Sequence, residues 1–259
     1  MSGGILSELT PGKIIPRNFG NIKHLTGSRM KDSGDTLLEE SIQLFFTTQL
    51  QFAKRDKLYV TEKIDGANVG VLKRGGNLYP LMRKGYDVRT SKYAFIRRFA
   101  DFVADNATRF DALLDDGERI CGEWMIKVHS LFYKMPHEPF VVFDIIKAGV
   151  TQKAGVTQKR PGFAEIIERC GRQRFTTAGL VWAGESIPVD DALKKLGIGF
   201  HGCLSVPEGL VYRYERDVRF EMSAKYVSNL SVGGNFMTDE NAYNEWVISG
   251  AANEQLTLR

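Results

Sequence analysis

The segment around Lys63 constrains the fold of this chain more than any other. Residues 58–61 and 67–72 are rich in hydrophobic and β-branched side chains and predict two short strands, and the polar segment 62–66 lies between them. Lys63 falls in the turn, with Glu62 and Asp65 beside it. Two rigid strands would hold this lysine in place, so we expect the rest of the chain to fold around it.

A lysine in such a turn has two interpretations. Its amine has an ordinary pKa of ~10.4, so it is protonated at neutral pH unless burial, a neighbouring cation or a metal lowers that pKa. Once neutral, the amine attacks carbonyl or phosphorus centres. A surface lysine in a hairpin is the simpler interpretation of residues 62–66 alone, and the remaining motifs have to decide.

Composition indicates an ordinary globular protein. The 259 residues suffice for one core or a core with a small appendage, and 43% hydrophobic with 25% charged residues is typical of soluble domains. No apolar run approaches the ~20 residues of a membrane span, and residues 1–10 lack the features of a signal peptide. We therefore expect a cytoplasmic protein with no membrane partner. The net charge of +4 is compatible with a polyanionic partner.

Periodicity and turn residues predict the other elements. The segment 36–39 fits a capping box that would start a helix ending near residue 55, and the glycines of 74–77 predict a hairpin that returns Arg83 toward Lys63. The other expected elements are helices within 93–114 and over 161–170, 189–196 and 240–248, strands over 120–124 and 139–146, and a hairpin over 207–225.

Other polar residues have simpler interpretations. Cys121, Cys170 and Cys203 lack a CxxC spacing, so neither a disulfide framework nor a zinc site is indicated. His129 and His137 have no third ligand at metal spacing and are interpreted as hydrogen-bonded structural residues. The hexamer of residues 148–153 is repeated as 154–159, as expected of a duplication in a surface loop. Asp144 is the single charge in an apolar run and needs a partner.

Six short motifs follow one another along the chain. They are Glu62-Lys-Ile-Asp-Gly-Ala-Asn68, Arg83, Cys121-Gly-Glu-Trp124, Phe143-Asp-Ile145, Glu208-Gly-Leu-Val211 and Lys225. This order, over residues 59–226, resembles the covalent nucleotidyltransferase superfamily of polynucleotide ligases and capping enzymes. The form of the first motif most resembles RNA ligases of the nick-sealing phage type and their small bacterial relatives.

The resemblance implies a fold and a reaction. It implies an α+β nucleotidyltransferase domain, similar to the ATP-grasp-like adenylation domain of ligases, with antiparallel sheets flanked by helices. The implied activity is ATP-dependent RNA ligation: Lys63 attacks the α-phosphorus of ATP, AMP moves to an RNA 5′-phosphate, and a 3′-hydroxyl displaces AMP. The implied cofactors are ATP and Mg²⁺, for which Mn²⁺ can substitute. The implied partners are RNA ends or nicks.

The resemblance also implies residue roles. The acids expected around the metal are Asp65, Glu123 and Glu208. The residues expected at the nucleotide are Lys63 for the covalent AMP, Phe143 stacked on adenine, Glu62 at its polar edge, Arg83 and Glu123 at the ribose, Lys225 at the α-phosphate, and Asn68 orienting the lysine or a metal-bound water. In addition, we expect Arg29, assisted by Lys31 or His24, to contact the β- and γ-phosphates, because arginine presents a planar fork to phosphate oxygens.

The chain departs from the family pattern in two places. RNA ligases typically carry KxK at the last motif, whereas Ser223 stands before Lys225 here. Only 34 residues follow Lys225, too few for a carboxy-terminal OB domain. We therefore expect an amino-terminal basic loop and helix (1–58) packed on an adenylyltransferase domain (59–259) that has no OB domain.

Several alternatives stay open. A DNA-nick ligase and a GTP-using guanylyltransferase belong to the same superfamily, and a nucleotide- or RNA-binding module without catalysis is a different class. The resemblance does not select the natural RNA, nicked or single-stranded ends, an oligomeric state, or a kinase or phosphatase that prepares the ends.

Overall fold

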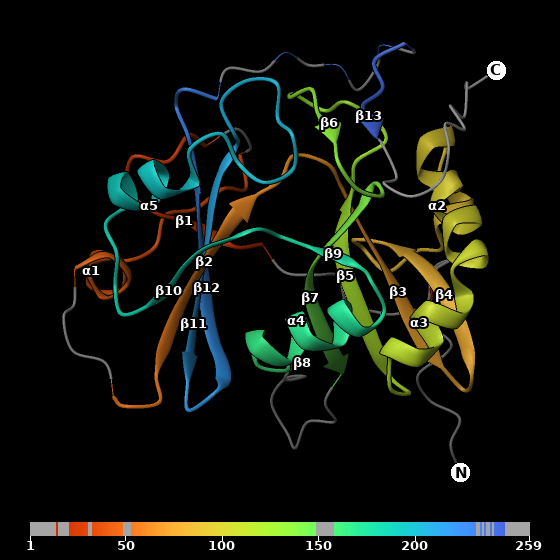
Figure 1. Ribbon diagram of the computed structural model, residues 1–259, viewed down its shortest axis with the longest axis horizontal. Coiled ribbons are helices and arrows are strands. Elements are labelled where there is room, and N and C mark those ends of the chain that lie inside the picture. The colour runs from red at the N-terminus through yellow and green to blue at the C-terminus, as the bar shows by residue number, and fades with distance from the viewer. Residues whose placement is uncertain are drawn as a thin grey trace.

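Two sheets form the framework of the molecule. The computed structural model describes residues 14, 21–30, 33–48, 53–148, 158–231, 234, 236, 239 and 241–246. Figure 1 shows the sheets lying next to each other, with α1 and α5 beside the first and α2 and α3 beside the second. Most strand pairs are antiparallel, as predicted. The pairs β1–β12, β7–β9 and β13–β6 are parallel, so the sheets are mixed. The predicted α+β fold is confirmed.

The strands of each sheet come from distant parts of the chain. The first sheet has the order β1 (Lys23–His24), β12 (Arg219–Val227), β11 (Gly209–Arg216), β2 (Lys57–Lys63) and β10 (Leu180–Gly184). The second has the order β4 (Asn77–Met82), β3 (Ala67–Arg74), β5 (Glu118–Trp124), β7 (Phe140–Ala148) and β8 (Gln158–Lys159), with β9 (Thr176–Thr177) beside β7. A separate pair joins β13 (Glu245–Trp246) to β6 (Lys134–Met135).

The strands on either side of the central lysine do not form a hairpin. β2 belongs to the first sheet and β3 to the second, so residues 64–66 cross from one sheet to the other. Lys63 is the last residue of β2 and not part of a turn. The chain therefore delivers this lysine to the junction between the sheets, which the local sequence pattern alone could not distinguish from a hairpin.

The hairpin predicted at residues 74–77 is confirmed. Arg74 pairs with Asn77 across the turn. Gly75 and Gly76 have φ angles of 57° and 74°, which residues with a Cβ atom rarely adopt. The turn has positive φ at both central residues, as in the type I′ turns that suit two-residue hairpins, and it sends β4 back along β3 toward Arg83.

Helices pack against both sheets. The helices are α1 (Glu40–Thr47), α2 (Ala94–Asp105), α3 (Ala107–Leu113), α4 (Phe163–Arg172) and α5 (Val189–Leu196), with a 3₁₀ turn, η2, over Val88–Thr90. Their apolar stripes form two separate cores, one around Phe99, Phe110 and Phe140 and one around Phe46 and Leu58. Burying such a side chain contributes about 1.5–3 kcal/mol.

Two helix predictions are wrong in part. The capping box at residues 36–39 does not form: the residue before α1 is Glu39, whose side chain makes no capping hydrogen bond, and α1 ends at Thr47. The helix expected over 240–248 is absent from its described part, 241–246, which contains β13. The backbone of β13 pairs in parallel with β6, and Glu245 N donates to Tyr133 O at 3.1 Å instead of to a helical carbonyl. Most of the repeated hexamer lies outside the described residues.

No helix within the described ranges has the length and apolar character needed to cross a membrane.

Candidate active site

A cavity of about 540 Å³ lies between the two sheets, and most of the predicted site residues line it. The first sheet contributes Glu62 and Lys63 from β2 and Lys225 from β12. The second contributes Asn68, Glu123 and Phe143 from β3, β5 and β7, and Arg83 follows β4. Residues up to 163 positions apart in sequence thus meet at one place because each lies on a strand, or directly after one, near the sheet junction.

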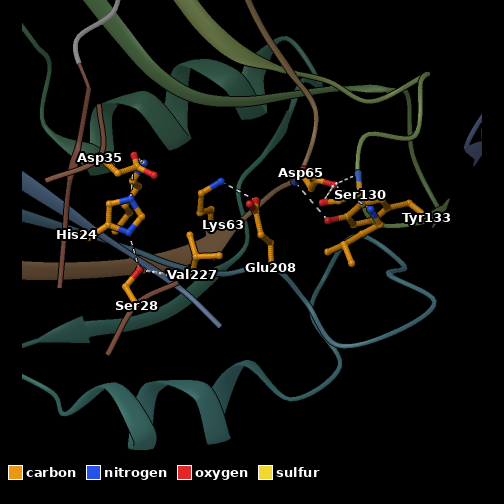
Figure 2. Close-up of polar contacts among 11 residues, drawn as sticks. His24, Ser28, Asp35, Lys63, Asp65, Ser130, Tyr133, Glu208 and Val227 are labelled. Carbon is orange, nitrogen blue, oxygen red and sulfur yellow. Dashed lines mark hydrogen bonds and ion pairs between the residues drawn. The ribbon is translucent and has the colours of Figure 1, made fainter. Parts of the chain in front are cut away.

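Lys63 is held by Glu208. Lys63 pairs with Gly209 in the β2–β11 register, so Glu208, just before β11, stands beside it (Figure 2). The Lys63 Nζ to Glu208 Oε2 distance is 2.5 Å. Burial lowers the pKa of the Lys63 amine, but the carboxylates of Glu208, Glu123 and Asp65 more than offset it, so the pKa lies above its ordinary value. The amine is therefore protonated until this ion pair opens.

Glu123 and Asn68 face each other across β5 and β3. Oε2 of Glu123 and Oδ1 of Asn68 are buried, and within the described residues neither has a hydrogen-bond partner. Burial raises the pKa of the Glu123 carboxyl to about 8, although nearby Lys63 lowers it. Unpaired buried acceptors are costly, and these two line a cavity that could admit a donor.

Glu62 lies at a different part of the cavity wall. Its Oε2 accepts a hydrogen bond from the Phe200 backbone N–H at 2.6 Å, while Oε1 is buried and has no partner in the described part of the chain. Gly199 has φ +80°, and a Cβ there would lie 2.7 Å from Oε1, so only glycine lets the turn close over this carboxyl. Burial raises the pKa of Glu62 to about 7, against the effect of the Phe200 hydrogen bond.

Asp65 is engaged elsewhere. Its Oδ2 accepts hydrogen bonds from Ser130 N and Oγ and from Leu131 N at 2.7–2.9 Å (Figure 2). Its carboxylate therefore holds the 130–131 turn, and neither Asp65 nor Glu208 is among the residues that line the cavity. Across the described ranges, no three His, Cys, Asp or Glu side chains converge closely enough to hold a metal ion directly.

The remaining predicted residues differ in placement. Arg83 donates a hydrogen bond to the Asn21 side-chain oxygen, and Phe143 is partly buried at the cavity wall. Lys225 lines the cavity, with Nζ 3.1 Å from Asp35 Oδ1. Arg29 does not line the cavity; its backbone N–H donates to Val227 O at 2.9 Å. Lys31 lies outside the described residues.

Sequence reasoning missed part of the cavity wall. Arg160 and Arg213 line it and form ion pairs with Asp144 at 2.7 and 3.1 Å. Ile22 also lines the cavity and packs near Phe143. The lone acid in the apolar run of β7 was the available signal, since a buried carboxylate requires a cation, but nothing in the local pattern says which arginine supplies it.

The raised pKa of Glu62 predicts a pH-dependent stability. A folded-state pKa of about 7 exceeds the ~4.3 of an unfolded chain, so the folded protein binds the extra proton in this window and the free energy of unfolding falls as pH rises from ~4.3 to 7. Glu62→Gln keeps an acceptor for Phe200 and removes the ionisation. We expect it to be more stable than wild type by about 1–3 kcal/mol at pH 8 and by much less at pH 4.5.

Urea unfolding at both pH values, without divalent cations, measures this difference. Glu39→Gln, at an exposed acid, is the matched control and should show the same small difference at both pH values. A Glu62→Gln effect equal at pH 4.5 and 8 would contradict the raised pKa.

Solved RNA ligases resemble this fold. An archaeal ATP-dependent RNA ligase is 20% identical with a TM-score of 0.48, and the match covers 83% of this chain and 49% of that one. A Naegleria gruberi RNA ligase with PPi is 18% identical, with a TM-score of 0.47 and coverages of 68% and 50%. A mutant of the Naegleria enzyme with ATP and Mn is 16% identical, with a TM-score of 0.46 and coverages of 68% and 51%. The chain therefore matches about half the length of these proteins.

A comparison with curated proteins found no match. The family model for RNA ligase matches residues 56–227, which is more than half of the chain. The matched region contains Lys63, Glu123, Glu208 and Lys225, and it agrees with the resemblance drawn from the motifs. The chain belongs to the RNA ligase family.

Proposed function

We propose that the protein is an ATP-dependent RNA ligase that joins 3′-hydroxyl and 5′-phosphate ends through a covalent lysyl-AMP and an RNA-adenylate. The observation that carries this proposal is the arrangement of Lys63 at a cavity between two sheets, beside Glu208 and among buried acceptors that have no partner in the described residues. Such a site provides one nucleophile and several fixed polar groups, which suits phosphoryl transfer by positioning and charge neutralisation.

In the first step, Lys63 acts as the nucleophile. Its Nζ forms a bond to the α-phosphorus of ATP, the bond from that phosphorus to the bridging oxygen breaks, and pyrophosphate leaves. The ion pair with Glu208 has to open first, and the ammonium then has to release a proton to water in the cavity, because an ammonium group has no lone pair. The triphosphate itself competes for the ammonium, so we propose that substrate binding draws Lys63 away from Glu208.

The acids fit a metal held through water better than one held directly. Glu123 and Glu208 act electrostatically on Lys63, and Oε2 of Glu123 has no partner in the described ranges, so it can accept a hydrogen bond from a metal-bound water. We propose Glu123 and Glu208 as the main residues toward Mg²⁺ or Mn²⁺, with Asp65 contributing charge while its carboxylate holds Ser130. When bound, such a cation neutralises developing charge on phosphate oxygens.

The nucleoside would be recognised by residues from both sheets. Oε1 of Glu62 is a buried acceptor, which suits the exocyclic amine of adenine. We propose that Phe143 stacks on the base, that Arg83 and Glu123 contact the ribose, and that Asn68 orients Lys63 or a metal-bound water. Lys225 would contact the α-phosphate. Arg29 stays our proposal for the β- and γ-phosphates, although reaching them requires its side chain to move to the cavity.

The later steps use the same site. AMP passes from Lys63 to the RNA 5′-phosphate, forming a phosphoanhydride, and an RNA 3′-hydroxyl then attacks that 5′-phosphate and releases AMP. We propose that residues 1–58 serve as an element packed on the adenylyltransferase domain 59–259. Leu25 and Phe46 support this because they share a buried cluster with Val60 and Tyr212 of that domain.

Labelling with α-³²P nucleotides tests the function. Wild-type protein with Mg²⁺ should form an acid-labile adduct from ATP and not from GTP, and should then seal a nick with a ribonucleotide 3′-end faster than an all-DNA nick, because 2′-hydroxyls and A-form geometry distinguish RNA. Labelling from GTP would indicate a guanylyltransferase, and equal sealing of DNA a DNA ligase. Absence of any adduct would indicate a binding module without catalysis.

A further inference from the structure

A buried histidine is linked through an aspartate to a lysine that lines the cavity. His24 is 1% exposed. Its Nε2 lies 3.1 Å from Asp35 Oδ1, and the same oxygen lies 3.1 Å from Nζ of the cavity-lining Lys225. Figure 2 shows His24 and Asp35 on the side of Lys63 away from Glu208 and Asp65. One carboxylate oxygen thus stands between an imidazole and an ammonium group.

The backbone holds these groups in register. β1 runs parallel to β12 with His24 opposite Lys225, and Leu25 N donates to Lys225 O at 2.9 Å. The segment that carries Asp35 is fixed on the other side, because His24 N donates to Thr36 O and Leu38 N donates to His24 O, both at 2.8 Å. Asp35 is therefore placed beside Lys225 by main-chain hydrogen bonds on both sides of His24.

The ring of His24 is oriented by its second nitrogen. Nδ1 lies 2.6 Å from Ser28 Oγ, and Val227 N donates to the same oxygen at 2.9 Å (Figure 2). Because a carboxylate can only accept, the network assigns the proton to Nε2, toward Asp35, and leaves Nδ1 to accept from the Ser28 hydroxyl. The contact of Nε2 with Asp35 is short but is not aligned as a full hydrogen bond.

The contact between Asp35 and Lys225 matters because β12 presents a single cationic side chain to the cavity. Of the β12 residues that line the cavity, Lys225 carries a positive charge, while Ser223, on the same face two residues earlier, offers a neutral hydroxyl. A lysine side chain has four rotatable bonds, so its ammonium group needs to be held in place to serve a phosphate. An ammonium has three donors, and the contact to Asp35 uses one and leaves two for the cavity.

We propose that His24 and Asp35 are positioning residues for nucleotidyl transfer, with His24 orienting Asp35 and Asp35 fixing the Lys225 ammonium toward the α-phosphate. This rests on the proposed function. Both ring nitrogens of His24 face Ser28 and Asp35, and His24 does not line the cavity, so in this proposal it acts within the protein and replaces our expectation of a phosphate contact. Preorganising the one cation of β12 at the cavity compensates for the neutral side chain at position 223.

The test compares two substitutions of His24 in two backgrounds. His24→Gln keeps an N–H donor directed at Asp35, whereas His24→Leu fills similar space without one. Single-turnover formation of the labelled Lys63 adduct from ATP should be about tenfold slower or more in His24→Leu and within about threefold of wild type in His24→Gln. In a Lys225→Met background the two substitutions should have equal rates, because the group they position is gone. Glu39→Gln is the exposed-acid control and should keep the wild-type rate.

Two results would overturn the proposal. The first is an equal rate of adduct formation in His24→Gln and His24→Leu when Lys225 is present. The second is a rate loss in His24→Leu that is just as large in the Lys225→Met background, because it would mean a general loosening of the fold. If the Lys225→Met protein forms the adduct too slowly to measure, the comparison of His24→Gln with His24→Leu in the wild-type background tests the proposal by itself. If His24→Leu does not fold, Asp35→Asn is compared with Asp35→Leu instead, and equal rates for these two variants would also overturn the proposal. Absence of an adduct in wild type would instead refute the proposed function.

Discussion

Lys63→Ala is expected to abolish the covalent nucleotide adduct. Removing the nucleophile of a covalent mechanism leaves no group to form the intermediate, and such losses reach roughly 10⁴-fold or more in other enzymes. In this protein the loss should be complete for labelling, since Lys63 Nζ is the amine held at the cavity by Glu208. Labelled ATP, denaturing electrophoresis and mapping of the labelled peptide by mass spectrometry measure it.

Lys57→Ala is the matched control. Lys57 is the first residue of the same strand β2, is exposed, and does not line the cavity, so its removal should leave labelling unchanged. Persistent labelling of the Lys63→Ala protein, with the label mapped to another lysine, would refute the assignment of the nucleophile. Unfolding of Lys63→Ala can be separated from loss of chemistry by circular dichroism and by comparing its urea midpoint with that of wild type.

The sequence predicted local elements better than their assembly. The glycine pair of the 74–77 turn, the aromatic stripe of α2 and the apolar run of β7 each carry a pattern that follows from turn geometry or periodicity, and all three were confirmed. The sequence did not predict that β2 and β3 belong to different sheets. A strand, a short polar segment and a second strand give the same sequence pattern in a hairpin and in a crossing between two sheets. The pairing of β2 with β10 and β11 depends on contacts more than 100 residues apart.

In the candidate site, too, single positions were predicted better than the contacts between them. The family motifs predicted the cavity-lining positions of Lys63, Glu123 and Lys225, yet the partners of these residues were not foreseen. The contact of Lys225 with Asp35 arises from a two-residue strand, β1, which is too short to produce a periodic signal. Residues such as Asp65 were assigned from the motif, whereas the hydrogen bonds from Ser130 depend on a loop that packs there only in the folded chain.

A buried ionic network joins the two sheets at the cavity. Arg213 of β11 lies 3.1 Å from Asp144 of β7 through Nη1 and 2.7 Å from Glu215 through Nε, and it also donates to Pro161 O. Arg160 completes the set by pairing with Asp144 at 2.7 Å. Asp144, Glu215 and Arg213 are all buried. Since Asp144 and Arg213 belong to different sheets, this network links the two walls of the cavity.

Arg213→Met is expected to lower the free energy of unfolding by about 3–5 kcal/mol, because removing one partner leaves buried carboxylates with less compensation. Asp144 would keep Arg160, and Glu215 would keep the Phe163 backbone N–H, which donates to Oε1 at 2.7 Å. Urea unfolding at pH 7 measures the loss. Arg172→Met is the matched control: its pair with Glu168 is exposed at both ends, so its removal should cost less than about 0.5 kcal/mol.

A double-mutant cycle separates the link between the sheets from simple loss of packing. Arg213→Met combined with Asp144→Asn should cost less than the sum of the two single changes, because each single variant leaves a buried charge that the other change removes. A loss for Arg213→Met no larger than for Arg172→Met would contradict the argument, and additive losses would show that the two residues act separately. If the losses are coupled, this pair of residues helps to set the width of the cavity. Each single variant should then also bind ATP more weakly, even though neither residue has been assigned a contact with the nucleotide.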